Sequence, residues 1–272
     1  MSDDRIQVEI DSAGVADVRL SRPDKLNAVD DAMFSAVANA GRELAKDRAL
    51  RSVVLSGEGR GFCAGLDTSS FARIAGGGET DGPTFNGFDI EPGEAANRAQ
   101  QFAWVWHELP VPVIAAVHGV CFGAGIQLAL AADIRFVAPD ARLSIMEMKW
   151  GLIPDVTGTQ ALRHLLPLDL IKELTYTARV VSGNEAVSLG LATHVSDSPR
   201  EAAYELAREI AGRSPTAVRA AKQLLDTASV VSPADGLRLE AQLQSQLIGS
   251  PNQIEAVKAN LAKRDPEFDD PQ

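Results

Sequence analysis

The stretch VIAAVHGVCFGAGIQLALAA, residues 113–132, decides the fold because it contains a strand, a tight turn and a helix in succession. Val113–Val117 is a short run of branched and small apolar residues, which is typical of a buried strand. The glycines at 119, 123 and 125 follow it, and they let the backbone turn sharply and come close to a ligand. Ile126–Ala132 then favours a helix. Strand, glycine turn and helix in this order predict an α/β fold.

The same region could be mistaken for a membrane span. Residues 111–132 contain no Asp, Glu, Lys or Arg, and the run is long enough to cross a bilayer. Pro112, His118, Gln127 and the glycines argue against a spanning helix. The first residues, Met1–Arg5, also lack the basic and apolar regions of a signal peptide. We therefore predict no membrane partner and a cytoplasmic location.

The composition is that of a globular protein that does not bind nucleic acid. Of the 272 residues, 45% are apolar and 23% are charged, so the chain can bury a sizeable core. The formal net charge is −11, which leaves no broad basic surface for nucleic acid or anionic lipid. Cys63 and Cys121 lack metal-ligand spacing, and the four histidines form no metal or triad pattern. We predict no metal site and expect both cysteines to be small buried side chains.

Short apolar runs and helical stretches alternate on both sides of residues 113–132. Strands are predicted at Ile6–Ile10, Val15–Leu20, Val53–Leu55, Asp133–Ala138 and Leu143–Ile145. Helices are predicted at 30–46 and 94–109, with a surface loop at Gly76–Gly93 that is rich in Gly, Pro, Asp and Thr. Strands separated by helices favour parallel pairing with right-handed crossovers.

Beyond about residue 165 the pattern becomes helical. Residues 182–185 fit a capping box. Ser214, Ser232 and Ser250 each precede a proline, which is the pattern of an N-cap followed by the first helical residue. The acidic end, residues 264–272, is expected to fray. We predict a mixed core over residues 1–195 and a helical region over residues 196–272.

Two loops containing glycine follow buried strands: GRGFCAGLD at 59–67 and HGVCFGAG at 118–125. The first N–H groups of the helix after the second loop lack intrahelical partners and lie at its positive end, where a developing oxyanion fits. The alternative is that both loops are only tight turns in a packed core. Residues 59–64 also match a G-x-G-x-x-A dinucleotide fingerprint, but residues 66–70 do not continue as a helix, which disfavours that match.

Taken together, these segments resemble the enoyl-CoA hydratase/isomerase (crotonase) superfamily. GRGFCAGLD, HGVCFGAGIQLALAAD and WGLIPD occur in the order and spacing of that family, and the resemblance covers residues 5–265. It implies an α/β fold, a crotonase-like spiral of ββα units over residues 1–195 that holds the active site. The C-terminal helical region, 196–272, would then be an oligomerisation region that packs homotrimers or hexamers. The resemblance also implies an oxyanion hole in which a thioester oxygen rests on the N–H groups of Leu66 and Ala124.

The resemblance places the catalytic side chains at Gln127, Glu147 and Asp155. Hydratases of the family usually carry glutamates at the first two positions, and this chain departs at Gln127, which can only hold a water or substrate by hydrogen bonds. Glu147 is flanked by apolar residues, so burial would raise its pKa toward working pH; the alternative is a solvated glutamate at a strand end. Asp155 precedes a predicted helix, so an N-cap role is an open alternative.

Coenzyme A would form the rest of the substrate, and no separate cofactor is implied. The predicted substrate-binding residues come from the two loops and from a basic segment before them: Ala64, Gly65, Asp67, Gly123, Arg22 and Lys25. Arg22 and Lys25 are candidates for phosphate contacts, with two solvated surface cations as the alternative. Lys258, Lys263 and Arg264 are candidates for contacts with the substrate of a neighbouring subunit.

We therefore predict an acyl-CoA hydratase or isomerase that stabilises an enolate with two backbone N–H groups and uses Glu147 as acid or base. Two alternatives stay open. Gln127 suggests a catalytically silent acyl-CoA-binding paralogue, and the 59–64 glycines suggest a nicotinamide-dependent oxidoreductase. The sequence leaves the acyl group undecided, as well as the choice among hydration, isomerisation and other enolate chemistry such as thioester hydrolysis.

Overall fold

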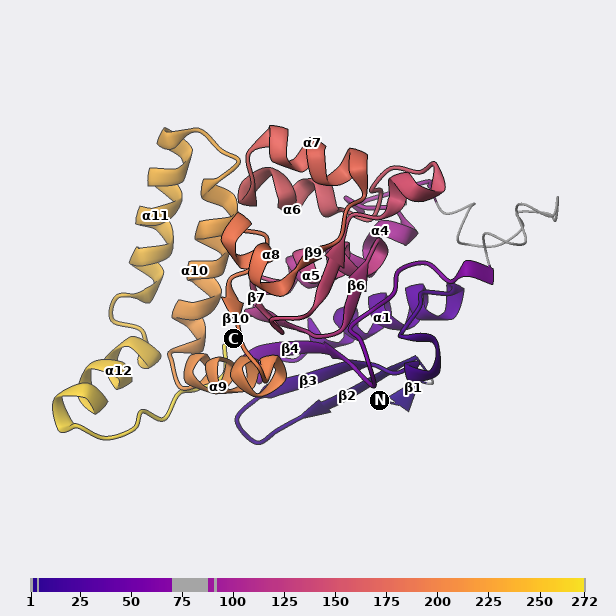
Figure 1. Ribbon diagram of the computed structural model, residues 1–272. Helices are drawn as coiled ribbons and strands as arrows, with labels where there is room; N and C mark the ends of the chain where they lie inside the picture. Colours follow the sequence, from indigo (N-terminus) through magenta and orange to yellow (C-terminus); the bar gives the residue numbers. More distant parts are fainter. Residues whose placement is uncertain (1, 4, 70–87, 91, 272) are drawn as a thin grey trace.

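The computed structural model of the protein describes residues 2–3, 5–69, 88–90 and 92–271 (Figure 1). The surface loop predicted at Gly76–Gly93 lies mostly outside the described residues. Within them, a seven-stranded sheet has the order β1-β2-β3-β4-β5-β7-β10, and a three-stranded sheet has the order β6-β8-β9. The strands of the larger sheet are β1 (Ser2–Asp3), β2 (Ile6–Ile10), β3 (Val15–Leu20), β4 (Ser52–Gly57), β5 (Val113–Val117), β7 (Ile134–Val137) and β10 (His194–Val195). Those of the smaller sheet are β6 (Val120–Phe122), β8 (Arg142–Ser144) and β9 (Val181–Ser182).

The strand pairing confirms the α/β class. β2 and β3 form an antiparallel hairpin in which Val8 lies opposite Val18. The pairs β3–β4, β4–β5, β5–β7 and β7–β10 are all parallel, because helical segments connect them. Residues 111–132 form β5, β6 and the short helix α5 (Ala124–Leu130). None of the helices that the structure describes has the length and apolar character needed to cross a membrane.

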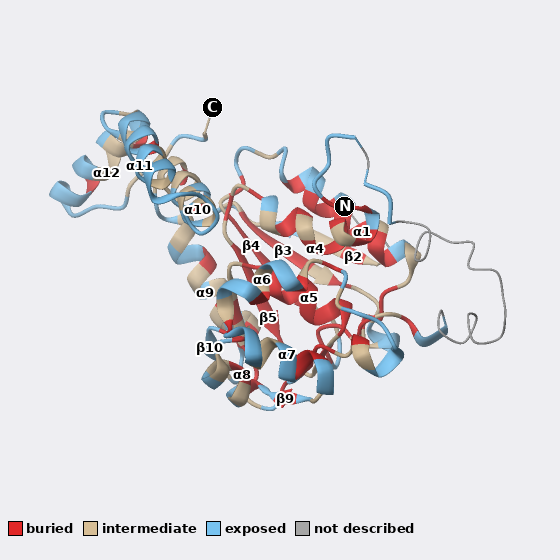
Figure 2. Cartoon of the chain, turned by 90° about the horizontal axis from the view of Figure 1, so that it is seen from above, coloured by how far each residue is buried: buried red, intermediate tan, exposed pale blue. Residues whose placement is uncertain are grey.

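Successive side chains of the central strands alternate between two apolar clusters, as a strand with both faces covered requires. In β4, Val53 and Leu55 face one cluster and Val54 faces the other. The first cluster packs against α1 (Asp31–Leu44), α4 (Arg98–Glu108) and α5. The second packs against α9 (Pro199–Ala211). The sheet is therefore a buried layer between helices, and Figure 2 shows β3, β4 and β5 as buried along their length.

Local capping sets where the first two long helices begin. Asp30 caps α1 by accepting a hydrogen bond from the Met33 N–H at 2.8 Å, so α1 starts where the sequence predicts. The helix predicted from residue 94 instead starts at Arg98. The reason is a capping box at Asn97 and Gln100, in which each side chain accepts a hydrogen bond from the other residue's backbone N–H.

The C-terminal half is helical, as predicted. Its helices are α6 (Gly158–Leu165), α7 (Leu168–Thr177), α8 (Gly183–Leu189), α9, α10 (Pro215–Ala228), α11 (Pro233–Leu247) and α12 (Pro251–Ala262). Ser214, Ser232 and Ser250 are the N-caps of α10, α11 and α12, each with proline at the next position. Ser182 caps α8, but the Glu185 carboxylate binds Arg179 rather than completing a capping box.

The C-terminal region divides in space at α10. α9, which the predicted division at residue 195 places in the helical region, packs on the sheet through Ala203 and Ala207. α11 and α12 project away from the core beside α10 and are largely exposed (Figures 1 and 2). Lys222 anchors α10 to the core, because its Nζ donates to the Val111 carbonyl at 3.1 Å and to Asp133 Oδ2 at 2.9 Å.

The prediction that the acidic end frays is wrong for residues 264–271, because specific side chains hold this segment. Asn252 of α12 exchanges two hydrogen bonds with the backbone of Asp269, at 3.0 and 2.9 Å. Arg264 pairs with Glu255, and Arg51 of the core pairs with Asp270. The last residues therefore connect α12 back to the start of β4.

Replacing Lys222 with Met should lower the free energy of unfolding by about 2–3 kcal/mol, because it leaves the Val111 carbonyl and the Asp133 carboxylate without their buried donor. Urea unfolding followed by fluorescence measures this change. Lys46→Met is the matched control, since Lys46 makes an exposed ion pair with Glu43; it should change stability by less than about 0.5 kcal/mol. Equal effects of the two substitutions would contradict an anchoring role for Lys222.

Candidate active site

Backbone hydrogen bonds hold the two glycine loops together along their length. The Phe62 N–H donates to the His118 carbonyl at 2.9 Å, and the Cys63 N–H donates to the Val120 carbonyl at 3.0 Å. In return, the Phe122 N–H donates to the Cys63 carbonyl at 3.0 Å. The loops therefore run side by side as an extension of the strands that precede them, although they are far apart in the sequence.

Two glycines let the loops come into van der Waals contact. Gly65 has a φ of +83°, and a Cβ atom there would lie 2.7 Å from the Phe122 carbonyl oxygen and 3.6 Å from Gly123 Cα. Gly123 has a φ of +53°, and a Cβ there would lie 3.5 Å from Glu147 Oε1. Both positions thus need glycine for their backbone conformation. The contact places the two chain segments that continue into Leu66 and Ala124 next to each other, and it places Gly123 beside Glu147 Oε1.

The N–H groups of Leu66 and Ala124 are both unpaired within the described part of the chain. Leu66 forms a parallel bridge with Val29, but the bonds of that bridge use the Gly65 carbonyl and the Asp67 N–H, so the Leu66 N–H points away from it. Ala124 is the first residue of α5, where an N–H has no intrahelical acceptor. Two neighbouring free donors of this kind can bind a single oxyanion.

Glu147 is a buried acid with one free oxygen. It begins the 3₁₀ turn η2 (Glu147–Trp150), and it is 8% exposed. Its Oε1 accepts a hydrogen bond from Gln127 Nε2 at 2.6 Å, whereas its buried Oε2 has no partner. Burial raises the pKa of Glu147 above its ordinary 4.5, and the charge of Asp155 adds to the rise. The alternative of a solvated glutamate is therefore wrong, and Oε2 has the properties of a proton-transfer atom.

Gln127 lies on α5 with its amide fully surrounded. Its Oε1 accepts hydrogen bonds from the N–H groups of Val156 at 2.9 Å and Gly158 at 3.0 Å, and its Nε2 donates to Glu147. Because the amide oxygen already has two protein donors, it is not available as an acceptor for a water. The structure thus brings Gln127 and Glu147 together, but the hydrogen bonds of Gln127 go mainly to the protein.

Asp155 precedes Val156, whose N–H binds Gln127 Oε1, and Gln127 in turn binds Glu147, so a chain of two hydrogen bonds links the Asp155 turn to Glu147. The residue is exposed overall, yet burial of its carboxyl by neighbouring atoms raises its pKa above the ordinary 3.8. The N-cap alternative is wrong, because α6 begins at Gly158 with Thr157 in the cap position. The amide oxygen of Gln127 takes the place of a capping side chain there. Asp155 is therefore free of that role.

Two of the predicted substrate-binding residues, Arg22 and Asp67, pair with each other. Arg22 binds Asp67 Oδ2 at 2.6 Å and the Ala28 carbonyl at 2.9 Å, so both charged side chains have partners within the protein. A hydrogen bond from the Ser69 N–H, together with Arg22, lowers the pKa of Asp67 to about 2 despite its burial. Lys25 is exposed, and Ala64 and Gly65 lie in the first loop beside the second. Lys25 is thus the more accessible of the two predicted cations.

Asn27 supports the site and was missed by sequence reasoning. It is fully buried, with a φ of +55°, and its Nδ2 donates to the carbonyls of Glu58, Gly61 and Phe62. This amide therefore fixes the first half of the first loop, residues 58–62, against residue 27. Asparagine is one of the few residues other than glycine that adopt the left-handed region readily. The sequence does not indicate, however, which loop its side chain would bind.

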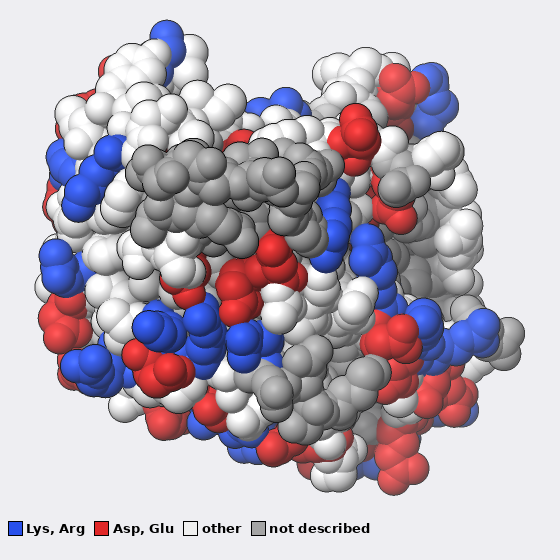
Figure 3. Space-filling view, turned by 90° about the vertical axis from the view of Figure 1, so that its right-hand side faces the viewer, with Lys and Arg blue, Asp and Glu red and all other residues white. Residues whose placement is uncertain are grey.

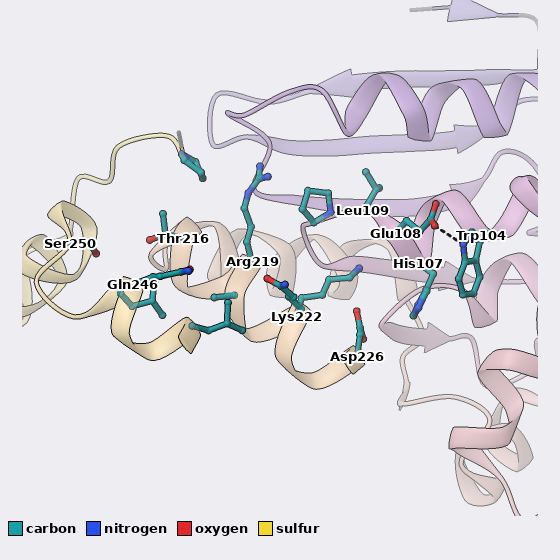
Figure 4. A pocket seen from close by; sticks show the side chains of 16 residues that line it. Trp104, His107, Glu108, Leu109, Thr216, Arg219, Lys222, Asp226, Gln246 and Ser250 are labelled. Carbon is teal, nitrogen blue, oxygen red and sulfur yellow. Dashed lines mark hydrogen bonds between the residues drawn. The ribbon is translucent and has the colours of Figure 1, made fainter. Parts of the chain in front are cut away.

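A pocket of about 620 Å³ lies elsewhere, between the end of α4 and helices α10 and α11. Trp104, His107, Arg219 and Asp226 are among its lining residues (Figure 4). None of the predicted site residues lines it, so it is separate from the Glu147 site. No group of His, Cys, Asp and Glu side chains within the described residues has the arrangement of a metal site. On the face shown in Figure 3, the acidic and basic residues outside the grey atoms are interspersed.

Comparison with known sequences identifies one family. The sequence profile of the enoyl-CoA hydratase/isomerase family matches residues 11–271. The mitochondrial methylglutaconyl-CoA hydratase of Mus musculus is 32% identical over 268 residues, covering 96% of this chain and 81% of that protein. The mitochondrial Delta(3,5)-Delta(2,4)-dienoyl-CoA isomerase of Mus musculus is 32% identical over 264 residues, covering 96% and 80%.

Solved structures agree. The enoyl-CoA hydratase from Bacillus anthracis superposes with a TM-score of 0.83 at 30% identity, covering 97% of this chain and 98% of that one. The enoyl-CoA hydratase from Polaromonas sp. JS666 superposes with a TM-score of 0.85 at 28% identity, covering 97% and 99%. The predicted fold class is therefore confirmed over nearly the whole chain.

Gly65→Ala should lower the free energy of unfolding by at least about 1 kcal/mol more than Gly249→Ala. Both glycines have positive φ, at +83° and +77°, but a Cβ at Gly249 meets nothing within 4 Å, whereas one at Gly65 strikes the Phe122 carbonyl. Denaturant unfolding of the two variants isolates the cost of separating the loops. Equal costs would mean that the loops are not in close contact.

Glu147→Gln should stabilise the protein increasingly as pH rises above the ordinary carboxyl pKa of 4.5. The folded-state pKa of Glu147 is raised, so in the window above 4.5 the unfolded chain loses a proton that the native site keeps. Wild-type stability therefore falls through that window, and the glutamine variant lacks this loss. Urea unfolding at pH 4 and pH 7 measures it. A difference between the two proteins that stays constant with pH would show that Glu147 is not desolvated.

Proposed function

The chain belongs to the enoyl-CoA hydratase/isomerase family, and on that premise we propose that Glu147 moves a proton on the acyl chain of an enoyl-CoA thioester. The chain is an enzyme of the hydratase and isomerase type, as its relatives are. The observation that carries the proposed mechanism is the buried, unpartnered Oε2 of Glu147 beside two unpaired backbone N–H groups. An acid or base in such a position typically contributes about 10²–10⁴-fold to a rate.

The thioester oxygen accepts hydrogen bonds from the N–H groups of Leu66 and Ala124. When a proton leaves the carbon next to the carbonyl, negative charge moves onto this oxygen, and each donor stabilises it by about 3–4 kcal/mol. Peptide N–H groups supply this stabilisation whatever the side chain. The free donors lie beside Gly123, which also approaches Glu147 Oε1, so the enolate would form within reach of the carboxyl.

Double-bond isomerisation is the branch that the site supports best. Glu147 takes a proton from one carbon of the acyl chain and returns it, or a second one, to another carbon. Asp155 lies near enough to act on the Glu147 charge, and its raised pKa suits a second acid. Hydration needs a held water, and the oxygen of Gln127 is already bonded to Val156 and Gly158. Hydration is therefore the second candidate, favoured by the hydratases among the relatives.

The two earlier alternatives fit the site less well. A silent acyl-CoA-binding paralogue would not need to keep a buried carboxyl oxygen unpaired, since that arrangement destabilises a protein. A nicotinamide enzyme would use the backbone of residues 59–64 to hold a pyrophosphate, but the N–H groups of Phe62, Cys63 and Ala64 donate within the protein. No cofactor beyond the coenzyme A of the substrate is needed for the proposed reaction.

We propose a homotrimer or hexamer in which the C-terminal region, 196–272, makes the subunit contacts through the helices beyond α9, while α9 packs on the catalytic core of residues 1–195. Large apolar side chains on the projecting helices support it, since Leu237 is 66% exposed and Leu261 is 82% exposed in the single chain. Lys25, Lys258 and Lys263 are the proposed contacts for coenzyme A phosphates. Arg264 is a weaker candidate because Glu255 binds it. A cytoplasmic location stays a prediction.

Glu147→Gln should slow proton exchange on the acyl chain strongly while leaving binding intact. We expect a fall in turnover of about 10²–10⁴-fold, because the amide cannot take a proton and the oxyanion donors are untouched. The measurement incubates the protein in D₂O with 2-enoyl, 3-enoyl and dienoyl-CoA thioesters and identifies the products and the deuterated carbons by NMR and mass spectrometry.

Glu205→Gln makes the same change at an exposed position of α9 and should leave turnover unchanged. Movement of the double bond with deuterium at two carbons supports isomerisation, and a 3-hydroxyacyl product supports hydration. If Glu147→Gln keeps normal turnover on every thioester that the wild type accepts, the assignment of Glu147 is wrong.

A further inference from the structure

The Gln127 amide joins three separate elements of the site. It stands on α5, donates to the first residue of η2, and accepts from the turn that leads into α6. The Gln127 side chain is 1% exposed. Three of its four hydrogen-bonding positions are thus filled by protein atoms, and only one N–H of the Nε2 group is left. A glutamine used in this way connects the proton-transfer groups rather than meeting solvent.

The same amide contacts Glu147 and the turn that carries Asp155. Its Nε2 donates to Glu147 Oε1 at 2.6 Å, which fixes the orientation of the carboxyl plane and leaves Oε2 without a partner. Its Oε1 binds the N–H groups of Val156 and Gly158, and Val156 directly follows Asp155. One side chain therefore sets the position of Glu147 and that of the turn that carries Asp155.

The residue opposite the amide is shaped to receive it. A Cβ atom on Gly158 would lie 2.7 Å from Gln127 Cγ and 2.9 Å from Gln127 Oε1. Gly158 is the first residue of α6, where alanine would otherwise be favoured in a helix. The glycine at this position gives the glutamine its space.

We propose that Gln127 is a positioning residue that fixes Glu147 Oε1 and the turn carrying Asp155 relative to each other. Glu147 Oε2 is then the atom that exchanges the proton. This inference rests on the proposed function, because it names the atom of Glu147 that acts. A second carboxylate at position 127 would face Glu147 at the distance where the amide now donates, and the pair could hold charge only by sharing a proton.

The hydrogen bond from Gln127 has a definite electrostatic effect. Burial and the negative charge of Asp155 raise the pKa of Glu147, while the backbone N–H of Glu147 itself and the Gln127 N–H lower it by stabilising the charged form. Asp155 is the charged group that acts on Glu147 among the described residues. Loss of the N–H donor therefore moves the pKa of Glu147 further up, which shifts the acid limb of the rate profile to higher pH.

Gly158→Ala tests the proposal without removing any hydrogen-bonding group. The new methyl group displaces the Gln127 amide, so we expect kcat/KM for the accepted enoyl-CoA to fall by about 10²-fold and its acid limb to move to higher pH. The affinity for the thioester should be unchanged, because the oxyanion donors stay in place. Gly236→Ala is the matched control in a helix, since a Cβ there would be 3.9 Å from Val231 Cγ2. It should keep the wild-type rate and pH profile.

Gln127→Glu is a second variant that keeps an acceptor for the Val156 and Gly158 N–H groups. The introduced carboxyl group and Glu147 stay hydrogen-bonded while they share one proton. They repel each other once that last proton is also lost. Like charges raise that second pKa, so we expect a new fall in kcat/KM on the alkaline side that the wild type lacks. Gln160→Glu, an exposed change on α6, should show no such fall.

Wild-type pH profiles for both Gly158→Ala and Gln127→Glu would overturn the positioning role. A slower Gly158→Ala enzyme whose acid limb has not moved would do the same, because it would indicate general loosening of the fold. These outcomes are distinct from failure of the proposed function. In that case Glu147→Gln itself keeps normal turnover, and the profiles no longer report on Glu147.

Discussion

The site depends on one geometric constraint: two peptide N–H groups from distant parts of the chain must lie side by side and remain unpaired. The two glycine loops meet it through reciprocal backbone bonds between Phe62–Cys63 and His118–Phe122 and through the close approach of Gly65 to Phe122. A side chain at the contact would separate the loops. Because these donors belong to the backbone, changes of side chain elsewhere in the proposed site leave them in place.

The acid beside these donors is held in a state that costs stability. A buried carboxyl oxygen without a partner is destabilising, and buried acids with a raised pKa are common at sites of proton transfer. The surrounding structure limits the cost. Gln127 binds the other oxygen of Glu147, and α5, on which Gln127 stands, is buried along its whole length. The parallel sheet beneath α5 provides the rigid support that a proton-transfer geometry requires.

The helices of the C-terminal half differ in whether they pack on the core. α9 packs on the face of the sheet opposite α1, α4 and α5, and it completes the buried layer. α10, anchored by Lys222, begins the part that leaves the core, and α11 and α12 carry exposed apolar side chains. Serine–proline caps start these three helices, so their first residues are set locally even though little of the core covers them.

The sequence by itself determined the elements and the family, because strand runs, glycine turns and serine–proline caps act through neighbouring residues. It also indicated Glu147 and the two loops. It placed the start of α4 too early and left the chain end frayed, since the Asn97–Gln100 capping box and the Asn252–Asp269 bonds form only with the right geometry. Only the tertiary structure decided that Gln127 binds Glu147 and the α6 turn, that Arg22 is held by Asp67, and that Asn27 shapes the first loop. These contacts join residues from different elements, and the free energy of a buried hydrogen bond depends on partners that local sequence does not name.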